Sequence, residues 1–169
     1  MNANRGMFLE TIIERTISYF TMRKIAHLSK RHLPIKVFSF KGNRVEGWIK
    51  SRTQTDYYGI YRGHYLDFEA KQTKEMSLPL SNIKKHQLSH MQQVHKYGAV
   101  VFLIVYFQRN DTIYLLPYEA LKKFFELDTK RQSIPINFFK EHGYEVEILY
   151  PGVLALQDVL DELISNKKI

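Results

Sequence analysis

The stretch YLDFEAKQT, residues 65–73, alternates apolar with polar, mostly charged side chains. In an extended strand, Asp67, Glu69 and Lys71 would share one face, and the apolar residues between them would share the other. Two interpretations fit this pattern. The charged face could keep an edge strand soluble, or it could supply two carboxylates and an ammonium to a metal-dependent active site.

The composition predicts a folded protein of one domain, covering residues 1–169. A chain of 169 residues is long enough to bury a sizeable core. Hydrophobic residues make up 44% and aromatic residues 14% of the chain, which favours folding over disorder. The absence of cysteine excludes disulfides and thiolate metal sites.

The apolar segments predict a soluble, cytoplasmic protein that has no membrane partner. The longest apolar run, AVVFLIVYF at residues 99–107, is too short to span a bilayer. The N-terminal residues lack the apolar region and small-residue cleavage site of a signal peptide.

The charge favours a polyanionic partner. Twenty-five Lys and Arg residues against seventeen Asp and Glu residues give a net charge of +8. Basic side chains release the counterions that condense on nucleic-acid phosphates, so DNA is a natural partner. A generally basic surface without a specific partner is the alternative. The charge alone does not indicate catalysis.

Hydrophobic periodicity predicts a mixture of helices and strands. Helices are expected at residues 7–26, 81–97, 118–126 and 155–164, and strands at 35–41, 45–61, 65–73, 99–107 and 112–118. Residues 128–152 are expected to form a loop with at most one strand. The predicted fold is therefore one α/β domain, in which helices flank a mixed sheet.

A turn at Arg62 and Gly63 would fold the chain back and bring Asp56 beside Glu69. Two carboxylates on adjacent strands can share a hard divalent cation. Lys71, on the same face as Glu69, could then orient a water molecule or stabilise charge on a phosphate. The alternative is an exposed charge cluster in which Asp67 pairs with Lys71.

The helix at 81–97 carries three polar residues of interest. Gln87 falls on the apolar face with Met91, where its carbonyl oxygen could complete a metal site or simply bond a backbone group. His86 and His90 are spaced like a zinc pair, but the metalloprotease pattern lacks its glutamate. Surface histidines on a helix that faces DNA are the favoured interpretation. The sequence also shows no glycine-rich phosphate loop and no nucleophile elbow.

Asp56 with Glu69-Ala70-Lys71 resembles the PD-(D/E)xK nuclease signature. The surrounding segments NRGMFLE (4–10), TDYYGIYRGHYLDFEAKQTK (55–74), LPL (78–80) and HQLSHM (86–91) resemble the RecU family of Holliday junction resolvases. This family occurs in low-GC Gram-positive bacteria and mycoplasmas. The resemblance spans most of the chain and weakens after about residue 125. It implies a restriction-endonuclease-like mixed sheet flanked by helices, with a protruding β stalk.

The resemblance also implies a mechanism and partners. Asp56, Glu69 and Gln87 would bind Mg²⁺ or Mn²⁺, and Lys71 would stabilise the transition state. A homodimer would nick two opposed strands of a four-way (Holliday) junction in DNA recombination and repair. Branched DNA is the implied substrate, and a recombinase is a further implied partner.

The implied stalk corresponds to residues 37–54 and would enter the open centre of the junction. Its basic residues, Lys41, Arg44, Lys50 and Arg52, are the candidate DNA contacts. Trp48 would either pack within the stalk or stack on a base.

The sequence departs from the family pattern next to Asp56. Thr55 replaces the proline of the general signature, and Gln54 stands where relatives often carry a threonine ligand. An amide oxygen could substitute for that hydroxyl. Two other functions remain open: a restriction-like or repair nuclease on duplex DNA, and a non-catalytic DNA-binding modulator of recombination. The intact set of Asp56, Glu69 and Lys71 favours catalysis, whereas the junction preference rests on the resemblance.

Overall fold

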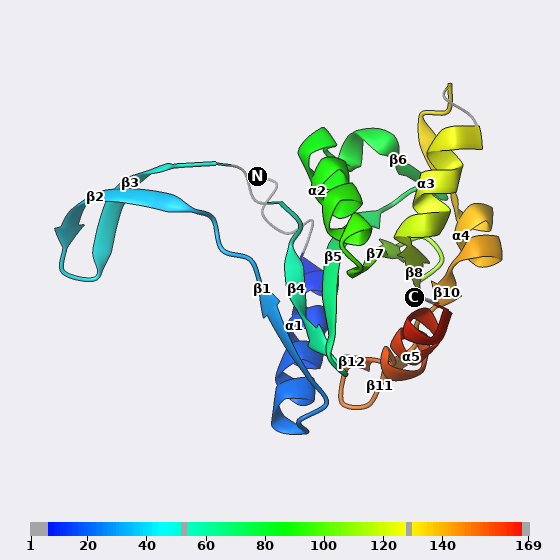
Figure 1. Cartoon of the computed structure of the whole chain (residues 1–169), viewed down its shortest axis with the longest axis horizontal. Helices are drawn as coiled ribbons and strands as arrows, with labels where there is room; N and C mark the ends of the chain where they lie inside the picture. Colours follow the sequence, from blue (N-terminus) through cyan, green and yellow to red (C-terminus); the bar gives the residue numbers. More distant parts are fainter. Residues whose placement is uncertain (1–6, 52–53, 128–129, 167–169) are drawn as a thin grey trace.

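A six-stranded sheet forms the body of the molecule, and a two-stranded hairpin extends from it (Figure 1). The computed structural model describes residues 7–51, 54–127 and 130–166. In chain order the elements are α1 (Met7–Met22), β1 (Ala26–Lys30), β2 (Ile35–Lys41), β3 (Arg44–Ile49), β4 (Tyr57–Tyr61), β5 (His64–Thr73), β6 (Ser77–Pro79), the short 3₁₀ helix η1 (Leu80–Asn82), α2 (Lys85–Lys96), β7 (Val100–Phe107), β8 (Thr112–Pro117), α3 (Tyr118–Leu127), β9 (Ser133–Pro135), α4 (Ile136–His142), β10 (Tyr144–Glu145), β11 (Ile148–Leu149), β12 (Val153–Leu154) and α5 (Gln157–Asn166).

The sheet is mixed, as predicted. Its strand order is β1-β4-β5-β7-β8-β10, with β5 and β7 parallel and all other neighbours antiparallel. The strand β5 therefore lies inside the sheet, between β4 and β7. The interpretation of its charged face as that of an exposed edge strand is wrong.

A two-residue turn fixes the register of β4 and β5. Arg62 and Gly63 both have positive φ, 48° and 80°, which is the backbone of a type I′ hairpin turn. The predicted reversal at these residues is confirmed. The register pairs Tyr61 with His64 at the turn and continues along both strands.

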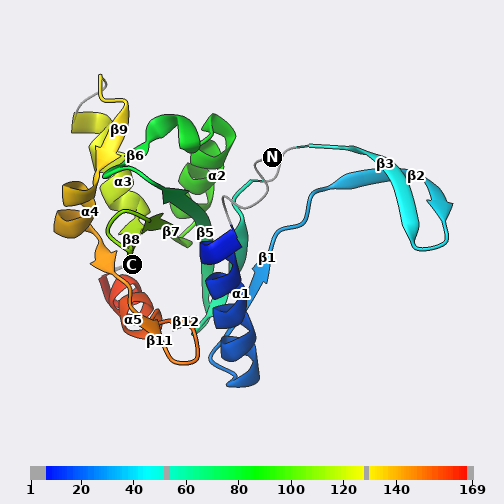
Figure 2. The same cartoon turned by 180° about the vertical axis from the view of Figure 1, so that it is seen from behind.

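The sheet is the middle layer between two layers of helices. Even-numbered residues of β7, such as Phe102, pack in one core with α1 and α5, and odd-numbered residues, such as Leu103, pack in another with α2, α3 and α4. In Figure 2, α1 lies in front of the part of the sheet that contains β1 and β5. The prediction of 99–107 as a central buried strand is confirmed, since nearly all of β7 is buried. No helix among the described residues is long and apolar enough to cross a membrane.

The N-terminal helix is shorter than predicted, and the strand after it was not predicted. The helix ends at Met22 rather than near residue 26, and the chain reverses through Lys24, whose φ is 55°. The strand β1 follows and pairs with β4. Gly59 permits this close pairing, because a Cβ there would lie 2.1 Å from the carbonyl oxygen of His27.

Three other segments differ from the prediction. The strand expected at 45–61 is two strands, β3 and β4, which belong to different sheets. The helix expected at 81–97 is divided: the 3₁₀ helix η1 covers Leu80–Asn82, and the α-helix α2 begins only at Lys85. The expected loop at 128–152 contains the helix α4, whose Phe138 and Phe139 pack into the core on the α2 side. Seven residues are too few for hydrophobic periodicity to distinguish such a helix from a buried loop.

The hairpin of β2 and β3 projects away from the body (Figure 1). The strands pair antiparallel, with an irregular register between Val37 and Ser39. At its root, the backbone N–H of Lys50 donates to the carbonyl oxygen of Pro34 over 2.8 Å. The predicted stalk, residues 37–54, overlaps this hairpin.

Candidate active site

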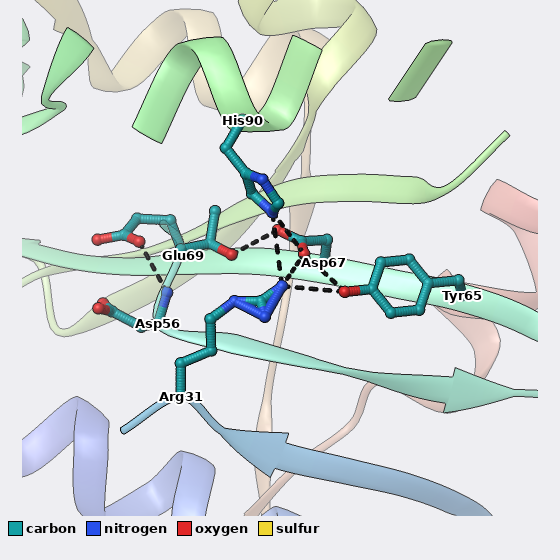
Figure 3. A network of polar contacts seen from close by, with 7 residues as sticks. Arg31, Asp56, Tyr65, Asp67, Glu69 and His90 are labelled. Atoms are coloured by element: carbon teal, nitrogen blue, oxygen red, sulfur yellow. Dashed lines mark hydrogen bonds and ion pairs between the residues drawn. The ribbon is translucent and has the colours of Figure 1, made fainter. Parts of the chain in front are cut away.

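Asp56 lies opposite Glu69. The register pairs Tyr57 with Phe68, so the residue before Tyr57 stands across from the residue after Phe68. The backbone N–H of Asp56 donates to Oε2 of Glu69 over 3.0 Å (Figure 3). Glu69 is fully buried. The hairpin turn therefore brings together the two residues that the sequence proposed as a pair.

Lys71 places an ammonium beside this pair. Its Nζ donates to Oε1 of Glu69, two residues earlier on β5. A cavity of about 210 Å³ is lined by Asp56 and Lys71, together with Glu10 and Lys30. Asp56 and Lys71 therefore line one cavity, while Glu69 contacts both residues from a buried position.

Gln87 reaches the same carboxylate from α2. It is buried on the helix face that also carries Met91, as periodicity predicts. Its Nε2 donates to Oε1 of Glu69 over 2.7 Å, and its own Oε1 accepts the backbone N–H of Lys84 over 3.0 Å. The carbonyl oxygen would have to leave Lys84 to bind a cation, so the assignment of Gln87 as a metal ligand stays a prediction.

Burial raises the pKa of the Glu69 carboxyl to about 8. The positive charge of Lys71 lowers this pKa, and the negative charge of Asp56 raises it. Without a bound cation, Glu69 therefore stays largely protonated at neutral pH. A divalent cation that bound Glu69 would release this proton.

The donors at this site fit a hard divalent cation. Asp56 and Glu69 offer carboxylate oxygens, which are ligands that Mg²⁺ and Mn²⁺ prefer, and the amide oxygen of Gln87 would join them only by leaving Lys84. Across the described ranges, no group of three or more His, Cys, Asp or Glu side chains is arranged to hold a metal ion. Mg²⁺ commonly binds through one or two carboxylates and keeps several waters. Two carboxylates therefore suffice for such a site.

Asp67, on the same strand face as Glu69, is also fully buried. Its ion-pair partner is Arg31, whose Nη2 donates to Oδ2, and not Lys71. The interpretation of this face as an exposed cluster with an Asp67–Lys71 pair is therefore wrong. Alternation indicates that Asp67 and Glu69 share a face, but burial depends on the neighbouring strands and on α2.

Three further side chains bond Asp67 (Figure 3). Oδ1 accepts the hydroxyl of Thr55, and Oδ2 accepts the hydroxyl of Tyr65 over 3.1 Å. Nε2 of His90 lies 3.0 Å from Oδ2 and carries the hydrogen, since a carboxylate only accepts. The interpretation of His90 as a surface histidine is wrong, because only 10% of its side chain is exposed.

Glu10 and Lys30 are site residues that the sequence did not single out. Glu10 from α1 and Lys30 from β1 form an ion pair at the wall of the cavity. The hydrogen bond to Glu10 raises the pKa of Lys30. Glu10 borders the apolar stripe of α1. Because Glu10 and Asp56 are far apart in the sequence, no local pattern predicts that they line one cavity.

The basic residues of the hairpin lie apart from this site. Lys41, Arg44 and Lys50 are exposed on the projecting hairpin, and Lys41 pairs with Glu46 over 3.1 Å. Arg52 lies outside the described residues. Their assignment as DNA contacts stays a prediction.

The two residues before Asp56 differ in exposure. Gln54, which stands in the place of a threonine ligand, is exposed. Thr55 is buried, and its hydroxyl donates to Oδ1 of Asp67. The assignment of Gln54 as a substitute for a hydroxyl ligand stays a prediction.

Comparison with known proteins places these residues in a family. A family model described as RecU, recombination protein U, matches residues 4–162. A Holliday junction resolvase RecU of Ureaplasma parvum is 38% identical over 162 residues, which cover 96% of this chain and 95% of that protein. A protein of the same name from Streptococcus gordonii is 36% identical, over 97% of this chain and 86% of the relative.

A solved structure of the Holliday junction resolvase Hjc from Archaeoglobus fulgidus is similar over 80% of this chain and 94% of that chain, with 17% identity and a TM-score of 0.49. The family model and the curated relatives both cover nearly the whole chain. The chain therefore belongs to the RecU family.

Proposed function

We propose that this chain is a metal-dependent endonuclease that resolves four-way DNA junctions in recombination, by nicking two opposed strands. The observation that carries the nuclease activity is the contact of Glu69 with both Asp56 and Lys71 at one cavity. The junction as substrate is supported by the relatives, which are named Holliday junction resolvases.

The side chains divide the chemistry of phosphodiester hydrolysis between them. A divalent cation held by Asp56 and Glu69 would activate water and neutralise charge on the phosphate. The Lys71 ammonium is placed to donate to a phosphate oxygen as negative charge develops there. Gln87 orients Glu69 through its amide hydrogen. One P–O bond of the backbone breaks as the water oxygen forms a new bond to phosphorus.

The charge of the chain supports a DNA substrate. The net charge of +8 favours binding to phosphates. The projecting hairpin carries Lys41, Arg44 and Lys50 on a segment that could reach into the open centre of a branched molecule. Duplex DNA offers no such opening. The hairpin therefore supports a junction over a duplex as substrate.

The hairpin also supports a homodimer. Its cross-strand pairs put Ile35, Val37, Phe40, Val45 and Ile49 on one face. Four of these five side chains are exposed, between 48% and 76%. An isolated two-stranded hairpin is marginally stable, and an exposed apolar face marks an interaction surface. A second copy of the chain, which presents the same face, would cover it.

A cleavage assay tests the proposed function. A mobile four-way junction and a duplex of matched sequence are incubated with the protein in Mg²⁺, in Mn²⁺ or in EDTA. Symmetric nicks in two opposed strands of the junction are expected only with a divalent cation, with little cutting of the duplex. Equal cutting of both substrates would indicate a duplex nuclease. Binding without cleavage under every condition would indicate a non-catalytic modulator.

A further inference from the structure

Each candidate metal ligand has a near neighbour that belongs to the hydrogen-bond network of Asp67. Glu69 follows Asp67 by two residues on β5. Asp56 directly follows Thr55, whose hydroxyl donates to Oδ1 of Asp67. Gln87 precedes His90 by about one turn of α2, and Nε2 of His90 lies 3.0 Å from Oδ2 of Asp67. The network therefore connects the three chain segments that carry the candidate ligands.

Arg31 connects a fourth segment to the same carboxylate. It follows β1 and leads into the hairpin, and its Nη2 donates to Oδ2 of Asp67 and to the Tyr65 hydroxyl, the latter over 2.9 Å. Its backbone N–H donates to the carbonyl oxygen of Asp56 over 2.7 Å. Its guanidinium lies 4.4 Å from the ring centroid of Tyr58. One residue thus holds both the backbone of Asp56 and the carboxylate of Asp67.

The arrangement does more than packing requires. Asp67 is wholly removed from water, and a buried carboxylate is costly unless charge and hydrogen bonds compensate it. An apolar side chain would fill the same space without that cost. The directional bonds of Asp67 instead join the segment after β1, the segment before β4 and the helix α2 to β5.

We propose that Asp67, Arg31 and His90 form a positioning network that sets the relative placement of Asp56, Glu69 and Gln87. Asp67, Arg31 and His90 do not contact the reacting atoms. They would act by holding the candidate metal ligands in place. This inference rests on the proposed nuclease function. It predicts that a loosened network slows cleavage, because small displacements of catalytic groups have large effects on rate. Removing a side chain that hydrogen-bonds to a metal ligand typically lowers activity or metal affinity by about 10- to 100-fold.

The test begins with Asp67→Asn, which keeps the side-chain shape but removes the charge. Single-turnover cleavage of a junction bound by excess protein is expected to fall by about 10- to 100-fold. The Kd for the junction in EDTA is expected to change by less than about 3-fold, since phosphate contacts lie elsewhere. The Mn²⁺ concentration for half-maximal rate is expected to rise. A purely structural role would lower Tm while leaving the rate and Mn²⁺ response of folded protein unchanged, and that result would overturn the proposal.

Asp161→Asn is the matched control. Asp161 also accepts from a tyrosine, Tyr61, over 2.8 Å and pairs with an arginine, Arg62, over 3.2 Å. It lies on α5, on the opposite side of the sheet from α2. Its substitution is expected to change Tm without changing the cleavage rate of the folded protein. Equal slowing by Asp161→Asn and Asp67→Asn would contradict a specific role for the network.

Two milder variants keep the test decisive if Asp67→Asn does not fold. Arg31→Lys keeps the charge but cannot make the several contacts of the guanidinium, and His90→Gln keeps one donor. Both are expected to fold and to cleave more slowly than the wild type with a raised Mn²⁺ requirement. Wild-type rates and Mn²⁺ responses in both variants would overturn the proposal.

Direct binding of Mn²⁺, measured by electron paramagnetic resonance, separates this inference from the proposed function. If the wild type binds Mn²⁺ but cuts no DNA, the nuclease function is wrong. Weaker Mn²⁺ binding by Asp67→Asn than by the wild type would then still support the network, and equal binding would contradict it. If the wild type cuts junctions and the variants match it in rate and Mn²⁺ affinity, the network proposal alone fails. A wild type that neither cuts DNA nor binds Mn²⁺ would overturn both.

Discussion

At the scale of single residues, Glu69 is the centre of the candidate site. Three donors from three chain segments reach its carboxyl group: Lys71, Gln87 and the backbone of Asp56. Oε1 accepts from both Lys71 and Gln87, and Oε2 accepts the backbone N–H of Asp56, so both buried oxygens are hydrogen-bonded. The buried acid is therefore tightly held, and its chemistry depends on all three neighbours.

The carboxylates carry the first prediction. Asp56→Asn and Glu69→Gln are each expected to lower the single-turnover rate on a junction by at least about 100-fold, the loss typical of removing one group that stabilises transition-state charge. Junction binding should stay within about 3-fold. Glu141→Gln, an exposed carboxyl on α4, is the control and should cleave normally. Near-normal nicking by either site variant would contradict the assignment.

The raised pKa of Glu69 carries the second prediction. Its folded-state pKa of about 8 lies above the unfolded value of about 4.5. Between these values the folded state binds more protons, so the free energy of unfolding falls as pH rises and levels off above pH 8. Glu69→Gln removes this dependence.

Melting temperatures in EDTA at pH 5.5, 7 and 8.5 test this. From pH 5.5 to pH 8.5, the Tm of the wild type should fall by at least about 3 °C more than the Tm of Glu69→Gln. One pKa unit corresponds to about 1.4 kcal/mol, and 1 kcal/mol shifts Tm by about 2–4 °C in a domain of this size. A constant difference between the two proteins would show that Glu69 is ionised throughout.

Gln87 carries the third prediction, because its amide serves both Glu69 and Lys84. If Gln87 is a ligand, Gln87→Ala should move half-maximal cleavage to a higher Mn²⁺ concentration by about 10-fold, with a small change in Tm. Gln93→Ala, on the exposed side of α2, is the control. A lower Tm with an unchanged Mn²⁺ response would assign Gln87 to the structure of α2.

Much of the site was predictable at this scale, and the exceptions have a physical cause. The two-residue turn at Arg62 and Gly63 sets the strand register, so the pairing of Asp56 with Glu69 follows from local sequence. Arg31 is 36 residues from Asp67, and His90 is 23 residues away. Their contacts arise from the order of strands and the placement of α2, which no local pattern encodes.

At the scale of elements, the hairpin is amphipathic. One face is apolar, and the other carries the cross-strand pairs of Lys36 with Trp48 and Lys41 with Arg44. The ring of Trp48 packs against that of Phe38 at an angle of 42°, with ring centroids 4.7 Å apart, and Trp48 remains 62% exposed. Trp48 therefore packs within the hairpin and still presents area to a partner.

The hairpin charges carry the fourth prediction. Replacing Lys41, Arg44 and Lys50 with Ala should lower junction affinity steeply and duplex affinity mildly, since only a junction has an opening for the hairpin. Each lost phosphate contact should reduce the slope of log K against log salt by roughly 0.9. Binding titrations at two salt concentrations measure both effects.

A matched control comes from the body of the molecule. Lys122, Lys123 and Lys140 are exposed on α3 and α4, and their replacement with Ala removes the same charge from another surface. This triple variant should lower affinity for both DNA forms by a similar factor. If the hairpin variant behaves in the same way, the hairpin is a general basic surface and does not enter junctions.

Element boundaries were less predictable than element types. The hydrophobic pattern identified α1 and α5, because each buries a stripe of apolar residues, and β7, because it is apolar on both faces. It missed β1, because AHLSK has five residues and only Leu28 is buried. Its pairing with β4 depends on the glycine at position 59, which gives no signal until the partner strand is known.

At the scale of the whole molecule, the three-layer body and the hairpin separate two tasks. The body holds the candidate site, where Gln87 of α2 bonds Glu69 and Glu10 of α1 lines the cavity, whereas the hairpin carries an exposed apolar face away from it. A two-fold dimer formed through that face would present two identical sites to opposed strands. Such a geometry would couple the two nicks.

The last prediction tests this coupling. Phe40, Val45 and Ile49 are replaced with Thr, which keeps β propensity but makes the exposed face polar. Light scattering should give twice the chain mass of 20.1 kDa for the wild type and the single mass for the variant. Ile60→Thr, which alters a residue 53% exposed on β4, is the control and should remain dimeric.

The cutting of a plasmid that carries a cruciform then reports whether the two nicks are coupled. A single nick releases supercoiling, so the cruciform is reabsorbed before an uncoupled second nick can occur. The wild type should therefore produce linear plasmid, whereas the variant should produce mostly nicked circles. A monomeric wild type that still produces linear plasmid would exclude dimerisation as the source of paired cleavage, and a dimeric variant would show that another surface joins the two copies.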